Sequence, residues 1–394
     1  EMSASLVGSE MCIRDREQIA AIKAGIEALS QKKADAIIET AQGETMILTD
    51  SSDKLFEGLR VFGKSTQDGT PSVENPVPIV NAGESGSITV EVTGRNLLKP
   101  NSYNTYYEFP LKSNTVITLM TNGKPSQGGN IKFSATDGSN VWFSIDAGQT
   151  RVCRSIGNKD VKGFYDLLSP DDGLEYMFAV GDIKTYTPYV EPQSLTLQTP
   201  NGLPGVPVDK DGNYTDADGQ QWICDEIDLE RGKYVQMVGK YVFDGTELIN
   251  DSWLPTIVVN MRSDGLTGLR INGGLLSNYD NVAFSNNTGK SFSFNSAKWG
   301  VSNGSELKEL LKTKSDSGSP VITQYALATP IERDLTPEEL AAYSSLHAYY
   351  PTTVITNDAE AHMEATYVAD TKAYINKKFE ELNQAIVKTQ IALL

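Results

Sequence analysis

Three carboxylates close together are the first candidates for acid–base chemistry. Asp225, Glu226 and Asp228 follow Trp222, and two carboxyl groups at a suitable separation can hydrolyse a glycosidic bond. Alternation along a strand points Asp225 to one face and the other two acids to the opposite face. We therefore interpret the trio as a solvated strand end, with a glycan-hydrolysing pair as the alternative.

A second acidic run begins like a calcium-binding loop. Asp209, Asp211 and Asn213 supply oxygen atoms at positions one, three and five of such a loop. Tyr214 and Gln220 then stand where an EF-hand requires glycine and glutamate. Because Asp, Gly and Asn favour turns, we predict a turn here, no bound metal and no cofactor.

The histidines and cysteines give little support to nucleophilic catalysis. His347 and His362 do not belong to a recognisable nucleophile motif. Cys12, Cys153 and Cys224 include no CxxC pair, which argues against a zinc site. We interpret the cysteines as free thiols, with a Cys153–Cys224 disulfide as the alternative, and we expect a protein that is not an enzyme.

Aromatic side chains offer a different chemistry, which is stacking against the C–H faces of sugar rings. Tyr103, Tyr106 and Tyr107 cluster in an expected loop, and Trp142 lies inside a strand pattern. Together the four residues are a candidate carbohydrate platform. Because tryptophan is highly buried on average, we interpret Trp142 as a core residue and the tyrosine cluster as the better candidate.

The charge balance restricts the partners that this chain can bind. The 394 residues include 51 acidic and 34 basic side chains, for a net charge of −17. Such a surface repels phosphate backbones and anionic membranes. No apolar run approaches the roughly 18 residues that a membrane-spanning helix needs. We therefore expect neither nucleic-acid binding nor membrane insertion.

Alternating residues and frequent turns predict a mainly β chain. Ser87–Thr93 places Ile88, Val90 and Val92 on one face, as in a strand with one buried side. Natural turn sequences such as Asn122-Gly123 separate further short strands. These strands are expected at Thr115–Met120, Asn130–Ala135, Val141–Ile145, Thr150–Ile156 and Leu174–Val180.

Two hairpins and two short helices are also expected. The hairpins are Asn213–Glu226 and Tyr234–Leu248, each around an Asp-Gly turn. One helix covers Ser305–Thr313. The other begins after Thr336, where Glu339 completes a capping box.

Apolar residues at both ends of the chain recur at alternating spacings of three and four. This period predicts helices over residues 17 to about 40 and 363–394. It favours a coiled coil between copies, hence a homo-oligomer with a trimer favoured. The alternative is packing on the chain's own β-structure or on the next protein of an assembly. The expected seam residues are Ile19, Ile22, Ile26, Leu29, Ile375, Phe379, Leu382 and Ile386.

Leu55–Leu98 stands between the helical and the β-rich parts of the sequence. Its Gly63–Pro78 run is rich in turn residues and prolines, so we interpret the stretch as a rigid joint between a stalk and the β-domains. The predicted fold is two jelly-roll-like β-sandwich domains flanked by N- and C-terminal helices. The predicted divisions are residues 1–16, 17–54, 55–93, 94–192, 193–334, 335–362 and 363–394.

Several blocks of this sequence resemble a known family. They are GLRVFGKSTQDGTPSVENPVPIVNAGESGSITVEVTGRNLL, PQSLTLQTPNGLPGVPV, GNYTDADGQQWICDEIDLERGKYVQMVG, YALATPIERDLTPEEL and YVADTKAYINKKF. These blocks resemble minor structural, tail-tip or baseplate proteins of tailed phages and prophages of Gram-positive bacteria. Residues 94–192 are similar to the carbohydrate-binding jelly rolls found in such proteins.

The resemblance implies a structural component of the virion tail or baseplate, made in the host cytoplasm. It implies contacts with other phage tail proteins and attachment to host surface carbohydrate, and it transfers no catalytic residue. A glycan-degrading virion enzyme and a bacterial surface adhesin are the alternatives. Residues 1–16 resemble translated sequencing-adapter sequence, marked by LVGSEMCIRDR, and we expect them not to belong to the natural protein.

Overall fold

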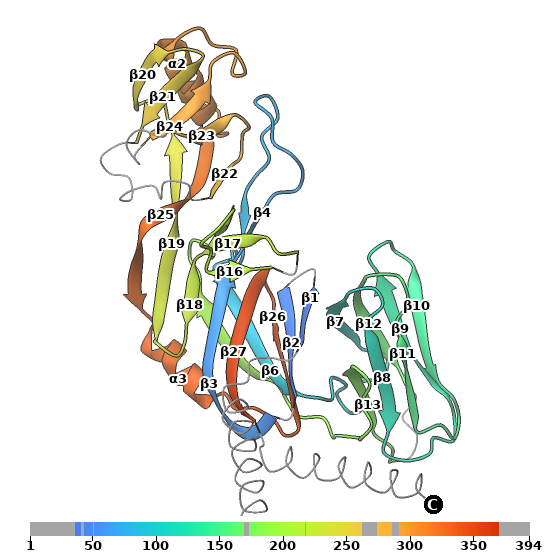
Figure 1. Ribbon diagram of the computed structural model, residues 1–394. Coiled ribbons are helices and arrows are strands. Elements are labelled where there is room, and N and C mark those ends of the chain that lie inside the picture. Colours follow the sequence, from blue (N-terminus) through green and yellow to red (C-terminus); the bar gives the residue numbers. More distant parts are fainter. Residues whose placement is uncertain are drawn as a thin grey trace, which may run out of the picture.

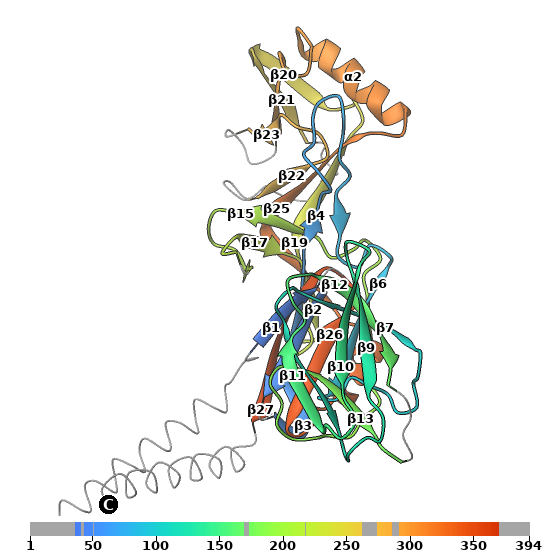
Figure 2. The same cartoon turned by 90° about the vertical axis from the view of Figure 1, so that its right-hand side faces the viewer.

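The protein has three β-rich parts, which we call the central sandwich, the side sandwich and the tip (Figure 1). A computed structural model describes residues 36–40, 43–49, 51–168, 173–216, 218–261, 274–285 and 291–369. The side sandwich, residues 106–180, lies beside the central one. The tip, formed by the described residues between 248 and 316, lies at the top of the molecule, above both sandwiches (Figure 2).

The first sheet of the central sandwich joins strands that are far apart in the sequence. β6 (Ser87–Gly94) pairs with β14 (Gln193–Gln198) on one side and β26 (Thr352–Asn357) on the other. β2 (Gly43–Thr49) and then β1 (Ala36–Thr40) extend the sheet beyond β26. All four pairings are antiparallel.

The second sheet has the order β22-β25-β19-β18-β3-β27. Its strands are β3 (Ser51–Gly63), β18 (Glu226–Asp228), β19 (Lys233–Phe243), β22 (Leu275–Ser277), β25 (Val321–Asp334) and β27 (Ala361–Ala369). The paired residues 238–243 of β19 and 321–326 of β25 continue toward the tip as a ribbon, which we call the arm (Figure 1).

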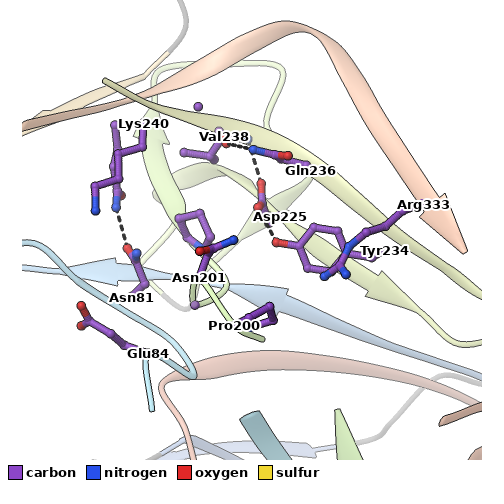
Figure 3. A pocket seen from close by; sticks show the side chains of 14 residues that line it. Asn81, Glu84, Pro200, Asn201, Asp225, Tyr234, Gln236, Val238, Lys240 and Arg333 are labelled. Carbon is purple, nitrogen blue, oxygen red and sulfur yellow. Dashed lines mark hydrogen bonds between the residues drawn. The ribbon is translucent and has the colours of Figure 1, made fainter. Parts of the chain in front are cut away.

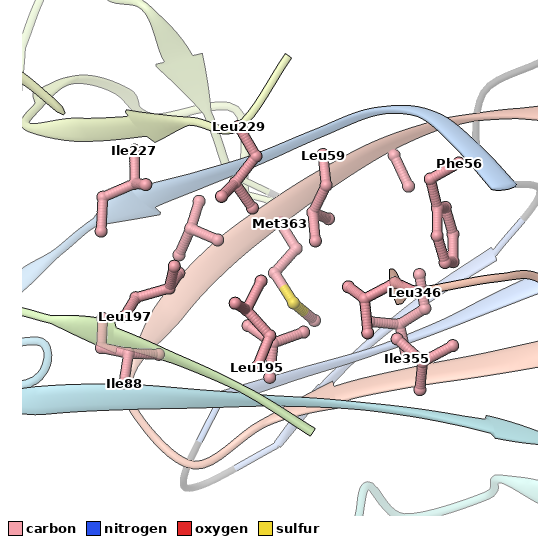
Figure 4. Packing of buried hydrophobic residues seen from close by; sticks show 14 of the residues in the cluster. Phe56, Leu59, Ile88, Leu195, Leu197, Ile227, Leu229, Leu346, Ile355 and Met363 are labelled. Atoms are coloured by element: carbon pink, nitrogen blue, oxygen red, sulfur yellow. The ribbon is translucent and has the colours of Figure 1, made fainter. Parts of the chain in front are cut away.

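Apolar side chains from both sheets meet in one core (Figure 4). Ile88, Val90 and Val92 of β6 are fully buried, which confirms the alternation expected for this strand. Leu59 of β3 and Met363 of β27 belong to the same cluster. Because a buried large aliphatic side chain contributes about 1.5–3 kcal/mol, this core holds together segments from both ends of the described chain.

The side sandwich consists of a four-stranded sheet, β10-β9-β12-β7, and a three-stranded sheet, β11-β8-β13. Its strands are β7 (Tyr106–Leu111), β8 (Val116–Thr121), β9 (Gly129–Ala135), β10 (Asn140–Ile145), β11 (Arg151–Ser155), β12 (Val161–Leu167) and β13 (Tyr176–Val180). The five strands predicted here are present within about two residues, and the structure adds β7 and β12. Phe133, Phe164 and Phe178 form the centre of the core, with ring centroids 4.7–5.9 Å apart.

The proline-rich run is a strut and not a joint between a stalk and β-domains. It leaves the central sandwich at β4 (Ser65–Thr66) and returns at β5 (Val80–Asn81), and between them it reaches the tip. The Val77 N–H donates to the Asn278 carbonyl at 2.9 Å, and Val73 packs against the apolar core of the tip. We call residues 67–79 the strut.

The tip packs a four-stranded sheet, β20-β21-β24-β23, against one helix. Its elements are β20 (Leu248–Trp253), β21 (Thr256–Asn260), β23 (Val282–Phe284), β24 (Ser291–Asn295) and α2 (Gly304–Asp316). A small sheet outside the tip contains β15 (Gly205–Val208), β16 (Tyr214–Thr215) and β17 (Gln221–Cys224). α3 (Pro337–Ser345) begins with the predicted capping box of Thr336 and Glu339, which is confirmed.

The predicted fold class is wrong, although the described chain is mainly β. Residues 36–40 and 363–369, where we expected helix, lie in strands β1 and β27. In β27 every second residue from Ala361 to Ala369 is buried, which is the period of a strand. The alternating spacings of three and four had predicted a helix there instead. The seam residues Ile19, Ile22, Ile26, Leu29, Ile375, Phe379, Leu382 and Ile386 lie outside the described residues.

The expectation of two successive sandwiches is also wrong. β18 pairs with β3, and β19 and then β25 extend the same sheet of the central sandwich beyond β18, while the segment between β19 and β25 forms the tip. The sheets therefore form across the whole described chain, because distant strands supply each other's hydrogen-bond partners.

Candidate functional site

Four side chains of the side sandwich form a line across the outer face of its four-stranded sheet. In the strand register Trp142 of β10 lies opposite Lys132 of β9, which lies opposite Tyr165 of β12, which lies opposite Tyr106 of β7. Neighbouring strands are roughly 4.8 Å apart, so the line is about 14 Å long. We call these four residues the aromatic row.

Three side chains of the aromatic row contact each other along the line, and Trp142 extends it in the register of β10. The rings of Tyr106 and Tyr165 have centroids 4.9 Å apart at an angle of 50°. The Lys132 ammonium lies 4.2 Å from the centroid of the Tyr165 ring, within cation–π range. Trp142 is 51% exposed and Tyr106 is 42% exposed. The row therefore combines accessible ring surface with one positive charge.

Alternation along the strands explains why these rings face outward. Phe143, the residue after Trp142, and Ile131, the residue before Lys132, are buried in the core. Phe164, the neighbour of Tyr165, is buried there as well. Each strand thus uses one face for folding and leaves the other face available for a ligand.

Gly163 creates the space for the Tyr106 ring. A Cβ atom at this position would lie 2.7 Å from Tyr106 Oη and 2.2 Å from the Tyr107 carbonyl oxygen. The register of β12 also shifts at this glycine, between Val161 and Gly163. Partial burial, with Glu108 and Tyr165 nearby, raises the pKa of the Tyr106 hydroxyl, so it stays protonated and can donate a hydrogen bond.

The structure brings together two of the four predicted platform residues. Tyr106 and Trp142 belong to the row, and the interpretation of Trp142 as a core residue is wrong. Tyr107 points to the opposite side of β7, where its ring stacks on Phe164 at 4.9 Å and lines a crevice of about 450 Å³ against the central sandwich. Tyr103 is 57% exposed in the loop before β7.

Sequence reasoning missed Lys132 and Tyr165. Lys132 stands in a segment that was correctly expected to be a strand, and its outward position followed from the alternation there. The strand that carries Tyr165 was not predicted, because its glycine and its register shift interrupt the period. Only the pairing of β9, β12 and β7 shows that these residues lie beside Tyr106.

Asp225 is buried and holds a bend in β19 (Figure 3). Its Oδ1 accepts hydrogen bonds from the N–H groups of Met237 and Val238, both at 2.7 Å, and its Oδ2 accepts one from Tyr234 Oη at 2.8 Å. The register between β19 and β25 shifts at these amides, so the carboxyl group supplies acceptors that the ladder lacks there. Burial raises the pKa of Asp225 to about 7, while the hydrogen bonds and the charge of Arg333 act in the opposite direction.

The interpretation of the acidic trio as a solvated strand end is wrong, since all three residues are at most 5% exposed. Glu226 and Asp228 point away from Asp225, as alternation predicted. Arg60 of β3 lies between them, with Nη2 2.7 Å from Glu226 Oε2 and Nε 4.0 Å from Asp228 Oδ2. Arg60 therefore compensates the buried charge of this pair.

The other candidate residues make structural contacts. Asn213, after the Asp209 turn, binds the backbone of Cys224 through both its side-chain oxygen and its side-chain nitrogen. His362 lies in β27, with its Nδ1 against Glu44 and its ring stacked 4.0 Å from that of Tyr214. Burial raises the pKa of the Cys224 thiol, so it stays protonated.

The described residues contain no cluster of three or more His, Cys, Asp or Glu side chains that could hold a metal. Among the helices described, none is long and apolar enough to cross a membrane. Comparison with protein-family models, curated proteins and solved structures finds no match for this chain.

Proposed function

We propose that this protein binds carbohydrate through the aromatic row, and that it does so as an attachment component of a phage tail or baseplate. The observation that carries the proposal is the alignment of Tyr106, Tyr165 and Trp142 around Lys132 on one open sheet face. When sugar rings stack on exposed aromatic rings, apolar surface of both is removed from water, which favours binding. The phage assignment rests on the sequence blocks quoted above.

The chemistry of the row suits a neutral or mixed sugar chain. The rings provide stacking surfaces, and the Lys132 ammonium donates hydrogen bonds to hydroxyl groups. On the same sheet face, Ser144 Oγ donates to Asn130 Oδ1 at 2.7 Å, which places polar groups near the row. A length of about 14 Å allows more than one sugar ring to be bound.

A single site of this kind binds weakly. An affinity of ~1 mM corresponds to only about 4 kcal/mol of binding free energy. Presentation of several copies on one particle would raise the overall affinity by ~10²–10⁴ without any new contact. We therefore propose that copies of this protein act together, which light scattering on residues 17–394 tests; a clean monomer would contradict multivalent attachment by this chain alone.

The direct test is a glycan array that includes wall polysaccharides of Gram-positive bacteria, followed by titration calorimetry with the ligand that binds. Trp142→Ala and Tyr106→Ala should each weaken binding by about 1–2 kcal/mol, or roughly 5- to 30-fold. The matched controls are Trp253→Ala and Tyr350→Ala, whose side chains are 57% and 53% exposed elsewhere on the protein. Binding that survives both row substitutions would reject the site.

The proposal is one of binding without hydrolysis. Incubation with the bound polysaccharide should release no reducing ends above a blank without protein. Reproducible release that Trp142→Ala abolishes would replace the binding function with that of a glycan-degrading enzyme.

A further inference from the structure

A polar pocket of about 740 Å³ lies where the arm leaves the central sandwich (Figure 3). Its walls come from segments distant in the sequence: β5 with the turn that follows it, the loop 200–204, Asp225, β19 and β25. The volume is in the range of small-molecule sites. The lining includes four amide side chains, which are those of Asn81, Asn201, Gln236 and Gln324.

Two cationic side chains, Arg333 and Lys240, line this pocket. Arg333 and Lys240 lie toward opposite ends of it (Figure 3). Within the described residues neither forms a salt bridge. Such cations are notable in a chain with a net charge of −17.

Alternation along β25 places Arg333 on one side of the strand and its two acidic neighbours on the other. Glu332 and Asp334 point the other way, and both are paired: Glu332 with Arg231 at 2.6 Å and Asp334 with Lys233 at 2.7 Å. Of these three neighbouring residues, only Arg333 lines the pocket. Its charge acts on Asp225, whose pKa it lowers, but no salt bridge within the described residues occupies its N–H donors.

The guanidinium group of Arg333 is held in place before any ligand binds. Its Cζ lies 4.0 Å from the centroid of the Tyr234 ring, and the Tyr234 hydroxyl is fixed by its hydrogen bond to Asp225. A stacked guanidinium keeps the N–H donors in its plane free for a carboxylate or phosphate. Preorganisation of this kind lowers the entropy lost on binding.

Two acids face the same space and limit the attraction. The Asp225 carboxyl group already accepts three hydrogen bonds from the protein, so its oxygens are not open to a ligand. Glu84 is exposed at the lip of the pocket and opposes an anion there. The balance still leaves two positive groups against one accessible negative group.

We propose that this pocket binds a small molecule bearing an oxyanion, a carboxylate or a phosphate, through the Arg333 guanidinium, with Lys240 supplying a second positive charge at the other end. The amide groups of Asn81 and Asn201 offer hydrogen bonds to the polar remainder of such a ligand. This site is separate from the aromatic row, and its occupancy does not depend on glycan binding.

The test is titration calorimetry of the full chain with citrate and, separately, with pyrophosphate, at matched ionic strength. Saturable binding of either anion supports the proposal, and the stronger of the two tells a carboxylate from a phosphate ligand. Arg333→Gln should weaken binding by about 10- to 100-fold. Lys240→Gln should weaken it by about 3-fold, because an ammonium on a flexible stem offers no fixed pair of donors.

The matched control is Arg231→Gln, which removes the same charge from the turn before β19, where Arg231 pairs with Glu332 and does not line the pocket. It should leave the affinity within about 2-fold. An equal loss in Arg231→Gln and Arg333→Gln would show nonspecific charge attraction and overturn the site. So would the absence of any binding tighter than about 10 mM. Unchanged thermal unfolding shows that each variant is folded, and Trp142→Ala should bind both anions normally.

Discussion

Asp225 makes the free energy of unfolding depend on pH in an unusual direction. Burial raises its pKa from 3.8 to about 7 in the folded protein. Between these values the unfolded chain has lost the proton while the folded chain still binds it. The folded state is therefore favoured below pH 4, and this contribution is lost as the pH rises to 7. A difference of about three pKa units corresponds to ~4 kcal/mol.

Asp225→Asn isolates this contribution from the other titrating groups. The asparagine Oδ1 can still accept the hydrogen bonds from Met237 and Val238, and its amide has no proton to lose in this range. Urea unfolding followed by tryptophan fluorescence at pH 4.5, 6 and 8 gives the free energy of each variant. We expect the free energy of unfolding of the wild type, minus that of the variant, to fall by about 3–4 kcal/mol from pH 4.5 to pH 8.

Two results would refute the reasoning about Asp225. If the difference in unfolding free energy between wild type and Asp225→Asn does not vary with pH, the carboxyl group titrates alike in the folded and unfolded chains. A difference that grows with pH would mean that the three hydrogen bonds outweigh burial and hold the group ionised. Asp225→Ala is a second check, because it leaves three buried donors without an acceptor and should cost several kcal/mol at every pH.

Two further substitutions test the aromatic row and a helix start. Gly163→Ala should shift β7 against β12 and lower the free energy of unfolding by about 1–3 kcal/mol. It should also weaken glycan binding as much as Tyr106→Ala does. The control in the same binding and unfolding assays is Gly94→Ala, where the new Cβ would be 3.4 Å from its nearest neighbour. Thr336→Ala removes the hydrogen bond from the Glu339 N–H at 3.2 Å and should cost about 1 kcal/mol in urea unfolding, whereas no measurable change would contradict a stabilising cap.

Local patterns in the sequence predicted local structure well. The alternation in Ser87–Thr93 identified β6, and Thr336 with Glu339 identified the start of α3. The Asp218-Gly219 turn identified the pairing of β16 with β17. Each of these features depends on residues within a few positions of one another.

Features that depend on distant partners were not predictable in this way. The Asp244-Gly245 turn suggested a hairpin, but β19 pairs with β18 and β25 while β20 pairs with β21. The exposure of Trp142 depends on which face of β10 the core occupies. The burial of Asp225 depends on a register shift in β19, which no residue type in the trio announces.

The candidate site shows the same division. The sequence indicated Tyr106 and Trp142 as candidates for stacking on sugar rings, because such stacking needs aromatic side chains. It could not place them in one row, since they are joined only through β9 and β12. Tyr107 was named with them, but adjacent residues of a strand point to opposite faces.

The strut changes how the tip responds to a pulling force. The arm is a narrow ribbon, in which only the short strand β22 is added beside β25, and a narrow ribbon bends easily about its thin axis. A load at its end would therefore swing the tip sideways. Here the strut meets the tip at a second point, through Val73 and Val77, and both supports end on the central sandwich. The two supports form a braced frame in which a sideways load stretches one member and compresses the other. Contacts made by the tip are thus transmitted to the body of the protein as force along stiff members and not as a hinge rotation.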